Sequence, residues 1–385
     1  MGTALDGCRS LFRVLGEYEF HLPPCLALSG LRYRLVQPRH ALRQFIQEQV
    51  AGDLLPAEDV DQKQKNLIAT GFLAMGIKRL GERNPRTFTM DMVDEQIDTM
   101  SRAVLGMTVA CARCHDHKFD PIPTTDYYSL AGIFLSTNTM YGTVFGTQNH
   151  RPADLIVLPK ADEQLLGQEY SQEQIQGMRD RAKSIKTEMN EIRLAARKKG
   201  ERPIQRQMVA MRNQIAKLDG ILGTLDENGK PRTYAMGARD GDEPADTNVL
   251  LRGDVEMQAQ KVKRGFLQVL SDVPAAKIAS NSSGRRELAK WLTAKENPLT
   301  ARVMVDRIWL HLFGEALQRS PNNWGTSAVQ PKQAELLDHL AVRFMENNWS
   351  TKSLIREIVL SKAYQRSSKF DEKNYDADPD NELLW

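Results

Sequence analysis

Cysteine is scarce in this chain: four cysteines in 385 residues exclude a fold held together by a network of disulfides. Long apolar runs are missing too, since no stretch reaches the roughly 18 residues that a membrane-spanning helix requires. A surplus of one charge sign is also lacking, because 52 lysines and arginines face 49 acids, a net charge of +3. That balance gives no reason to expect nucleic acid as a partner. What remains is the composition of a globular protein long enough for more than one domain.

The sequence signatures of several large enzyme classes are absent. The chain has no G-x-S-x-G nucleophile motif, no P-loop, no H-E-x-x-H zinc motif and no dinucleotide-binding fingerprint. The sequence therefore indicates no catalytic residues, and it does not decide whether the protein is an enzyme.

The most informative stretch is CARCHDHKFDP, residues 111–121, which holds two of the cysteines. Cys111, Cys114 and His115 form C-x-x-C-H, the spacing at which two thiols bond to a c-type haem and the histidine binds its iron. Upstream, apolar residues recur every three or four positions, which predicts a helix with one buried face. They are Val93, Ile97, Met100, Val104 and Met107. If that helix continues to residue 115, both thiols and His115 share one face, so we predict a haem c site with His115 as the proximal iron ligand.

Three other interpretations of this stretch stay open. Cys111, Cys114, His115 and His117 supply donor types that zinc or non-haem iron accepts, although structural zinc sites usually draw ligands from two separated segments. A C-x-x-C pair is also typical of a redox dithiol, but the surrounding βαβ pattern of thioredoxin-like proteins is missing. In the third interpretation Cys111 is simply the last buried residue of the apolar stripe. A second axial ligand to a haem iron is indicated by residue type alone, with the candidates Met140, His150 and His311.

The remaining patterns predict a mainly α fold, in which two helical domains are separated by an antiparallel helical hairpin and a small β-containing linker. Two apolar seams, at 175–196 and 204–222, are joined by a short break and predict the hairpin. A short strand is expected in NVLLRGDV, residues 248–255. The expected segments are an atypical N-terminal segment at 1–44, a helical domain with the C-x-x-C-H motif at 45–158, the hairpin at 159–225, the linker at 226–280 and a truncated C-terminal helical domain at 281–385.

Two groups of acidic residues are interpreted as solvated surface. Asp91, Asp94, Glu95 and Asp98 lie opposite the apolar stripe of their helix. The acids of 240–246 lie in a stretch that contains glycine and proline, and they lack the regular ligand spacing of a calcium loop.

A resemblance to a known family, the planctomycete cytochrome-C-associated proteins of unknown function, covers residues 94–137, DEQIDTMSRAVLGMTVACARCHDHKFDPIPTTDYYSLAGIFLST. It extends to 45–56, 69–76, 245–255, 264–270 and much of 285–368, which indicates two family domains on either side of the hairpin. Cys111, Cys114 and His115 match the family's C-x-x-C-H, and residues 116–121 complete its signature. Trp309 and His311 match its I-W-x-H-x-F segment.

This resemblance implies a setting, a cofactor and partners. It implies a periplasmic or secreted protein that carries haem c and works with a redox partner protein and with polysaccharide-associated partners. The leading prediction is therefore an extracytoplasmic haem-c-binding protein whose electron transfer is linked to an oxidoreductase or a polysaccharide-degradation system. One alternative is an enzyme or domain that binds zinc or non-haem iron at the same cluster, with His117 or His311 as a further ligand. The other is a non-catalytic scaffold or interaction protein.

The chain departs from the family pattern at both ends. Residues 1–40 do not resemble the family and show no recognisable signal peptide. The chain also stops at 381–385 where family members continue, so a fragment is expected. His339 stands where the family usually has tryptophan, and it is not expected to be a ligand.

Overall fold

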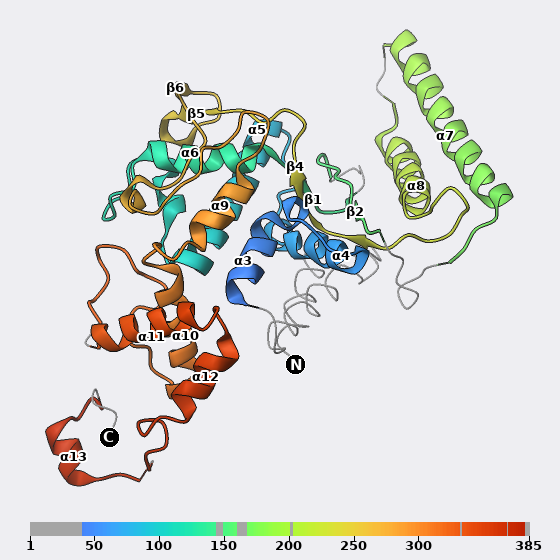
Figure 1. Cartoon of the computed structure of the whole chain (residues 1–385). Helices are drawn as coiled ribbons and strands as arrows, with labels where there is room; N and C mark the ends of the chain where they lie inside the picture. The colour runs from blue at the N-terminus through green and yellow to red at the C-terminus, as the bar shows by residue number, and fades with distance from the viewer. Residues whose placement is uncertain are drawn as a thin grey trace. The chain divides into compact units, whose positions relative to one another are not determined.

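The computed structural model describes residues 41–143, 149–159, 168–200, 203–331, 333–367 and 369–381. Helices dominate these residues and the strands form only two-stranded pairs, so the predicted mainly α fold is confirmed (Figure 1). No helix in those ranges combines the length and the apolar character needed to cross a membrane. Most of the predicted N-terminal segment, with Cys8 and Cys25, lies outside the described residues.

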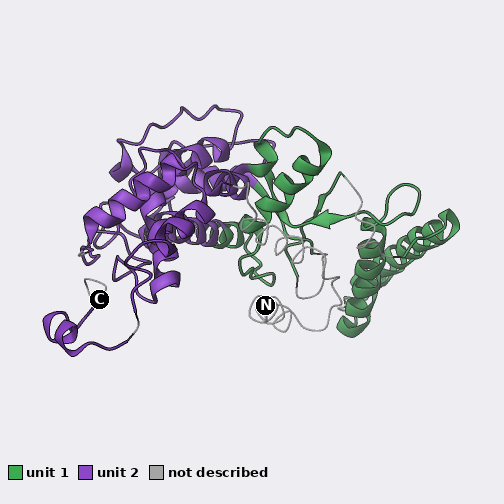
Figure 2. Cartoon of the chain, turned by 60° about the horizontal axis from the view of Figure 1, so that its bottom comes forward, with its two compact units in different colours: residues 1–30, 52–92, 138–239 green, residues 31–51, 93–137, 240–385 purple. Residues whose placement is uncertain are grey.

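The chain divides into two compact units, each built from stretches that are far apart in the sequence (Figure 2). Among the described residues, unit 1 comprises Gly52–Met92 and Asn138–Arg239, and unit 2 comprises 41–51, Val93–Thr137 and 240–381. Unit 2 therefore contains both the C-x-x-C-H stretch and the C-terminal helices.

Unit 1 contains the helical hairpin, whose helices are α7 (Gln172–Lys198) and α8 (Gln205–Gly223) (Figure 1). They pack through a small buried cluster of Ile185, Met189, Met208 and Met211, which lie on the predicted seams. The unit also holds η1 (Gly52–Leu54), α4 (Val60–Ala69), η2 (Thr70–Ala74) and the start of α5 (Pro85–Met100). Its strands are the pair β2 (Ile156–Val157) and β3 (Tyr234–Ala235) and most of the pair β1 (Thr137–Met140) and β4 (Gly237–Asp240).

Unit 2 is assembled from helices and one strand hairpin. Its helices are α3 (Leu42–Ala51), the second half of α5, α6 (Thr124–Leu135), α9 (Arg285–Leu292), α10 (Thr300–Phe313), α11 (Ala334–Glu346), α12 (Thr351–Val359) and α13 (Glu372–Ala377). The strand predicted in NVLLRGDV is β5 (Thr247–Leu250), which pairs antiparallel with β6 (Gln258–Val262). The short η6 (Leu251–Gly253) follows β5, and η7 (Gln268–Leu270) follows β6.

The apolar stripe before the C-x-x-C-H stretch is buried as predicted, but its helix is shorter than predicted. After α5 ends at Met100, one wider turn, η3 (Ser101–Leu105), follows, and Gly106 closes it with a left-handed backbone, φ 64°. A residue with a Cβ rarely adopts this conformation, so glycine ends the helix here. The predicted continuous helix to His115 is therefore wrong. Cys111 is exposed, so it is not the last buried residue of the stripe either.

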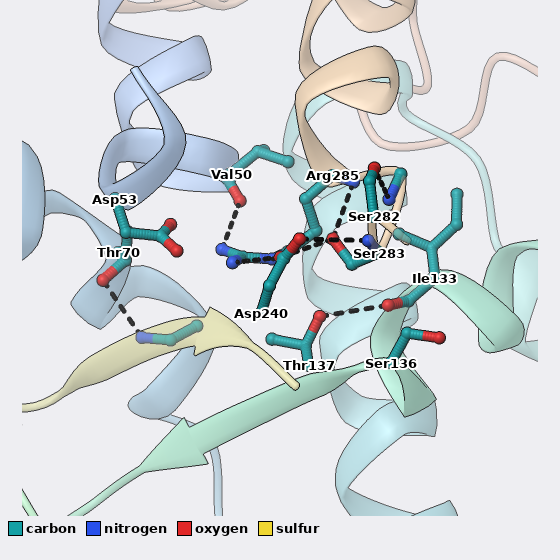
Figure 3. Close-up of polar contacts among 12 residues, drawn as sticks. Val50, Asp53, Thr70, Ile133, Ser136, Thr137, Asp240, Ser282, Ser283 and Arg285 are labelled. Carbon is teal, nitrogen blue, oxygen red and sulfur yellow. Dashed lines mark hydrogen bonds and ion pairs between the residues drawn. The ribbon is translucent and has the colours of Figure 1, made fainter. Parts of the chain in front are cut away.

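A buried arginine links α9 to the end of α3 and to Asp240. Arg285, the first residue of α9, has no exposed surface, and its guanidinium donates to Asp240 Oδ1 from Nη2 (2.7 Å) and Nε (3.2 Å). Its Nη1 donates to the carbonyl of Val50 (3.2 Å), while Ser283 donates its N–H and its hydroxyl to the Asp240 carboxylate (Figure 3). Since the guanidinium, the carboxylate and the carbonyl satisfy one another, this cluster holds three distant stretches of unit 2 together.

The interpretation of residues 240–246 as a solvated loop is therefore wrong at Asp240. Asp246 stays 33% exposed but also has a partner, because its carboxylate accepts from the backbone N–H (3.1 Å) and the guanidinium (3.2 Å) of Arg264. These interactions lower the pKa of Asp246 below its usual value, although burial acts in the opposite direction and is the largest single effect. Both arginines lie well downstream in the sequence, where local composition gives no sign of the pairing.

Candidate functional site

The two cysteines of the C-x-x-C-H stretch lie on and just after a short 3₁₀ helix, η4 (Val109–Arg113). The carbonyl of Thr108 accepts the N–H of Cys111 (3.1 Å), and Cys114 directly follows η4 as its C-cap. A 3₁₀ helix has three residues per turn, so side chains three positions apart lie on the same side. Cys111 and Cys114 therefore share one side although the predicted long helix is absent. Both cysteines are exposed residues and neither forms a disulfide, so both are available to react.

Two buried tyrosines of α6 support η4. The hydroxyl of Tyr128 lies within hydrogen-bonding distance of the carbonyls of Arg113 (3.0 Å) and Leu250 (3.4 Å). Burial raises the pKa of Tyr128 to about 12, so its hydroxyl remains a donor at neutral pH. The neighbouring Tyr127 donates to Asp94 (2.6 Å), which also pairs with the guanidinium of Arg113 (3.4 Å). This network connects the end of η4 with α5, α6 and β5.

Asp94 is 29% exposed, as its position on the helix predicts, but it also has two partners that the sequence does not predict. The other acids of that row also have partners: Asp91 pairs with Arg79, Asp98 pairs with Arg102, and Glu95 accepts from Thr99. The sequence interpretation missed the role of the two tyrosines. One signal for them exists, because α6 is apolar around most of its circumference, and a tyrosine buried in such a helix needs a partner for its hydroxyl.

His115 has one ring nitrogen held by the backbone. Its Nδ1 lies 2.7 Å from the carbonyl oxygen of Asp116, and a carbonyl only accepts, so Nδ1 carries the proton. Nε2 then presents its lone pair, and the side chain is exposed. Metal-binding histidines typically hold their other ring N–H in this way. The Asp116 carboxylate accepts the N–H (2.8 Å) and hydroxyl of Thr124 at the start of α6, and these hydrogen bonds lower the pKa of Asp116.

His117 is used differently, because both of its ring nitrogens are engaged within the protein. Nδ1 accepts the backbone N–H groups of Asp120 (2.8 Å) and Phe119 (3.3 Å), so it carries no proton. Nε2 therefore carries the proton and donates it to the hydroxyl of Thr108 (3.1 Å). The side chain is only 7% exposed. His117 thus holds together the turn that follows Cys114, and it has no ring lone pair left for a metal. This structural role explains why His117 belongs to the family signature although C-x-x-C-H chemistry does not require it.

The variant His117→Ala is expected to lower the free energy of unfolding by about 1–3 kcal/mol, because two backbone N–H groups and a hydroxyl lose their partner. The matched variant His115→Ala removes an exposed ring, and its effect is expected to stay below about 0.5 kcal/mol. Chemical denaturation of the reduced chain measures both values. Equal losses of stability in the two variants would contradict the structural role of His117.

The turn after His117 is fixed by the C-terminal part of unit 2. The buried carboxylate of Asp120 accepts the N–H (2.7 Å) and the hydroxyl (3.1 Å) of Thr326, 206 positions away in the sequence. The same hydroxyl lies 2.6 Å from the carbonyl of Phe119. Gly325 lies so close to this carboxylate that a Cβ on it would be 2.1 Å from Asp120 Oδ1. Glycine at 325 therefore leaves room for the Asp120 carboxylate to lie against the backbone.

The glycine that ends η3 is held by the same C-terminal stretch. The N–H of Trp324 donates to the carbonyl of Gly106 (3.0 Å), and the indole covers Gly106 so closely that a Cβ there would lie 2.3 Å from its Cδ1. The guanidinium of Arg307 donates to the carbonyls of Arg102 (2.7 Å) and Ala103. We call this set of contacts the C-terminal seam. It joins Arg102–Gly106 and Phe119–Asp120 on one side to Arg307 and Trp324–Thr326 on the other.

Of the other predicted ligands, two belong to unit 1 and one to unit 2. Met140 and His150 belong to unit 1. His311 is exposed in the last turn of α10, where Trp309 stacks on Phe313 with ring centroids 4.1 Å apart. The I-W-x-H-x-F segment is thus explained by aromatic packing on either side of an exposed histidine. Throughout the described part of the chain, no three or more His, Cys, Asp or Glu side chains are grouped to hold a metal ion.

Comparison with protein families matches two segments of the chain. Residues 35–139 match PSCyt2, a protein of unknown function (DUF1549), and residues 284–385 match PSD1, a protein of unknown function (DUF1553). No curated protein and no solved structure gives a match. The first segment contains η4 and the second contains Trp324 and Thr326, so the C-terminal seam joins the two matched segments within one unit.

Proposed function

The chain belongs to the planctomycete cytochrome-C-associated proteins of unknown function, and within that family we propose that it binds haem c through Cys111, Cys114 and His115 and transfers electrons. Covalent haem attachment takes place outside the cytoplasm, so the proposal includes a periplasmic or secreted setting. The electrons would pass to or from a redox partner protein linked to an oxidoreductase or a polysaccharide-degradation system.

The observation that carries this proposal is the difference between the two histidines beside the thiols. His115 keeps Nδ1–H on the Asp116 carbonyl and leaves Nε2 with an exposed lone pair, as an axial iron ligand requires. His117 has both nitrogens engaged and is not suited to bind iron. The two thiols on one side of η4, followed directly by a ligand-competent histidine, fit the donor set that haem c needs.

A haem held there would supply one-electron redox chemistry. The chain's own residues have three tasks. The thiols of Cys111 and Cys114 anchor the group, and the Asp116 carbonyl fixes the orientation of the His115 ring. Thr124 in turn fixes Asp116 to the start of α6, so the ligand is attached to a helix and not to a free loop. Because the thiols and His115 are exposed, a partner protein has access to the site.

Zinc or non-haem iron at the same cluster is less well supported. A structural zinc site needs four ligands, and the fourth donor in this stretch, His117, uses both ring nitrogens inside the protein. A scaffold role gives no reason for two exposed thiols and a histidine with a prepared lone pair. No contact among the described residues specifically favours a zinc or non-haem iron site or a scaffold role.

The absorption spectrum of the full chain, fused to an export signal and produced in a host that matures c-type cytochromes, tests the proposal. We expect a Soret band that is lost in the double variant Cys111→Ala, Cys114→Ala. His115→Ala is expected to change the position of the band because the iron loses a ligand, whereas His117→Ala, if folded, keeps the spectrum of the parent. A colourless exported protein contradicts the proposal, and stoichiometric zinc or iron without haem in elemental analysis favours the metal alternative.

A further inference from the structure

The turn between β5 and β6 meets the thiol of Cys114. A Cβ built on Gly253 would lie 2.7 Å from Cys114 Sγ, closer than real Cβ contacts allow, so the thiol packs directly on the glycine backbone. Gly253 has φ 73°, and the residue before it, Arg252, has φ 55°. Left-handed residues other than glycine are uncommon, and they gather where a site requires a particular backbone geometry. The turn therefore has an unusual shape at the point where it touches the thiol.

The turn is firmly held in this position. The N–H of Leu251 donates to the carbonyl of Met257 (2.8 Å), which closes the turn. The hydroxyl of Tyr128 lies between the carbonyl of Leu250, just before the turn, and the carbonyl of Arg113, just before Cys114. One buried side chain thus contacts both the residue before the turn and the end of η4, next to Gly253 and Cys114.

We propose that Gly253 is a positioning residue for the thiol of Cys114, and that the β5–β6 turn is therefore part of the C-x-x-C-H site. The turn lies outside both matched family segments, which end at 139 and begin again at 284, although residues 245–255 resemble the family. Glycine at 253 leaves room for Sγ, and the backbone of the turn limits which direction the thiol takes. This role belongs to the reduced, haem-free chain, so testing it does not depend on whether haem is attached later.

Thiol alkylation measures the role of Gly253 directly. The full chain is prepared with Cys8 and Cys25 replaced by serine and with either Cys111→Ser or Cys114→Ser, so that one thiol remains. Iodoacetamide then reacts with that thiol: the new S–C bond replaces the C–I bond, iodide leaves and the thiol proton goes to solvent. The rate reports how accessible each thiol is to the reagent.

Gly253→Ala is expected to raise the rate at Cys114 at least about threefold, because Sγ must rotate away from the added methyl group into solvent. The rate at Cys111 is expected to stay within about 1.5-fold of its parent, since the methyl group is not directed at it.

Gly314→Ala is the matched control, because Gly314 also has a left-handed backbone, φ 83°, but a Cβ there meets nothing within 4 Å. It carries the same kind of backbone strain in the same unit and is expected to leave both rates unchanged.

If Gly253→Ala fails to fold, Tyr128→Phe takes its place. This variant removes the hydroxyl between η4 and β5 and is also expected to raise the rate at Cys114. Tyr141→Phe, which removes a similar hydroxyl–carbonyl contact to Arg151 (2.9 Å), is its control. An unchanged or lower rate at Cys114, or equal increases at both cysteines, overturns the proposal.

Discussion

Replacing Arg285 with alanine is expected to lower the free energy of unfolding by about 3–5 kcal/mol, because removal of one partner leaves the other polar groups of a buried pair without compensation. The guanidinium has no exposed surface, and its loss takes donors from Asp240 and from the Val50 carbonyl at the end of α3. The Asp240 side chain is 22% exposed, so water replaces part of its lost hydrogen bonding. We therefore expect a loss in the lower half of the range of about 3–5 kcal/mol. The effect is large because Arg285 joins α3, α9 and Asp240, the last residue of β4.

Chemical denaturation measures the loss, and Arg343→Ala is its matched control. Arg343 pairs with Glu357 (3.2 Å), but both side chains are substantially exposed, at 44% and 32%. Such a pair contributes at most about 1 kcal/mol. If the two variants lose similar stability, the Arg285 cluster does not have the role assigned to it.

The variant Gly106→Ala is expected to cost about 3 kcal/mol through two additive causes. Its left-handed backbone, φ 64°, costs a residue with a Cβ about 1–2 kcal/mol. The new methyl group would also lie 2.3 Å from the Trp324 indole, and overpacking of this kind costs a further 1–3 kcal/mol or so. Because Gly106 ends η3 and contacts Trp324, the variant disturbs both the end of the helix and the C-terminal seam.

Gly314→Ala separates these two causes. Gly314 is also left-handed, with φ 83°, and has open space around it, so only the backbone cost of about 1–2 kcal/mol is expected. The difference between the two variants, measured by denaturation, is the contribution of the Trp324 contact. A difference of zero would mean that the seam does not hold the end of η3.

The sequence predicts the buried stripe from Val93 to Met107 and the helical hairpin, because both depend on a local period of apolar residues. It does not predict where the stripe stops being a helix. Val104 and Met107 keep the helical spacing on either side of Gly106, so the period continues through the left-handed residue. The thiols nevertheless share one side, because a 3₁₀ helix brings together residues three positions apart.

The parts of the site that the sequence does not reveal are its long-range contacts. The sequence places Asp94 and Asp240 among surface acids, yet Asp94 contacts Tyr127 and Arg113, and Asp240 contacts Arg285. Asp120 belongs to the family signature, and its contact with Thr326 is not evident from the sequence either. Hydrogen bonds between such distant positions leave no local pattern. The same holds for Gly253, whose contact with Cys114 follows from the fold and not from the composition of its loop.

The intact mass of the exported full chain under denaturing conditions tests the central claim most directly, because thioether bonds to haem survive denaturation whereas metal coordination and non-covalent haem do not. We expect the mass of the chain plus one haem, and the mass of the chain alone when Cys111 and Cys114 are both replaced by alanine. The mass of the chain alone for the parent protein, from a host that attaches haem to a control cytochrome, would contradict the account.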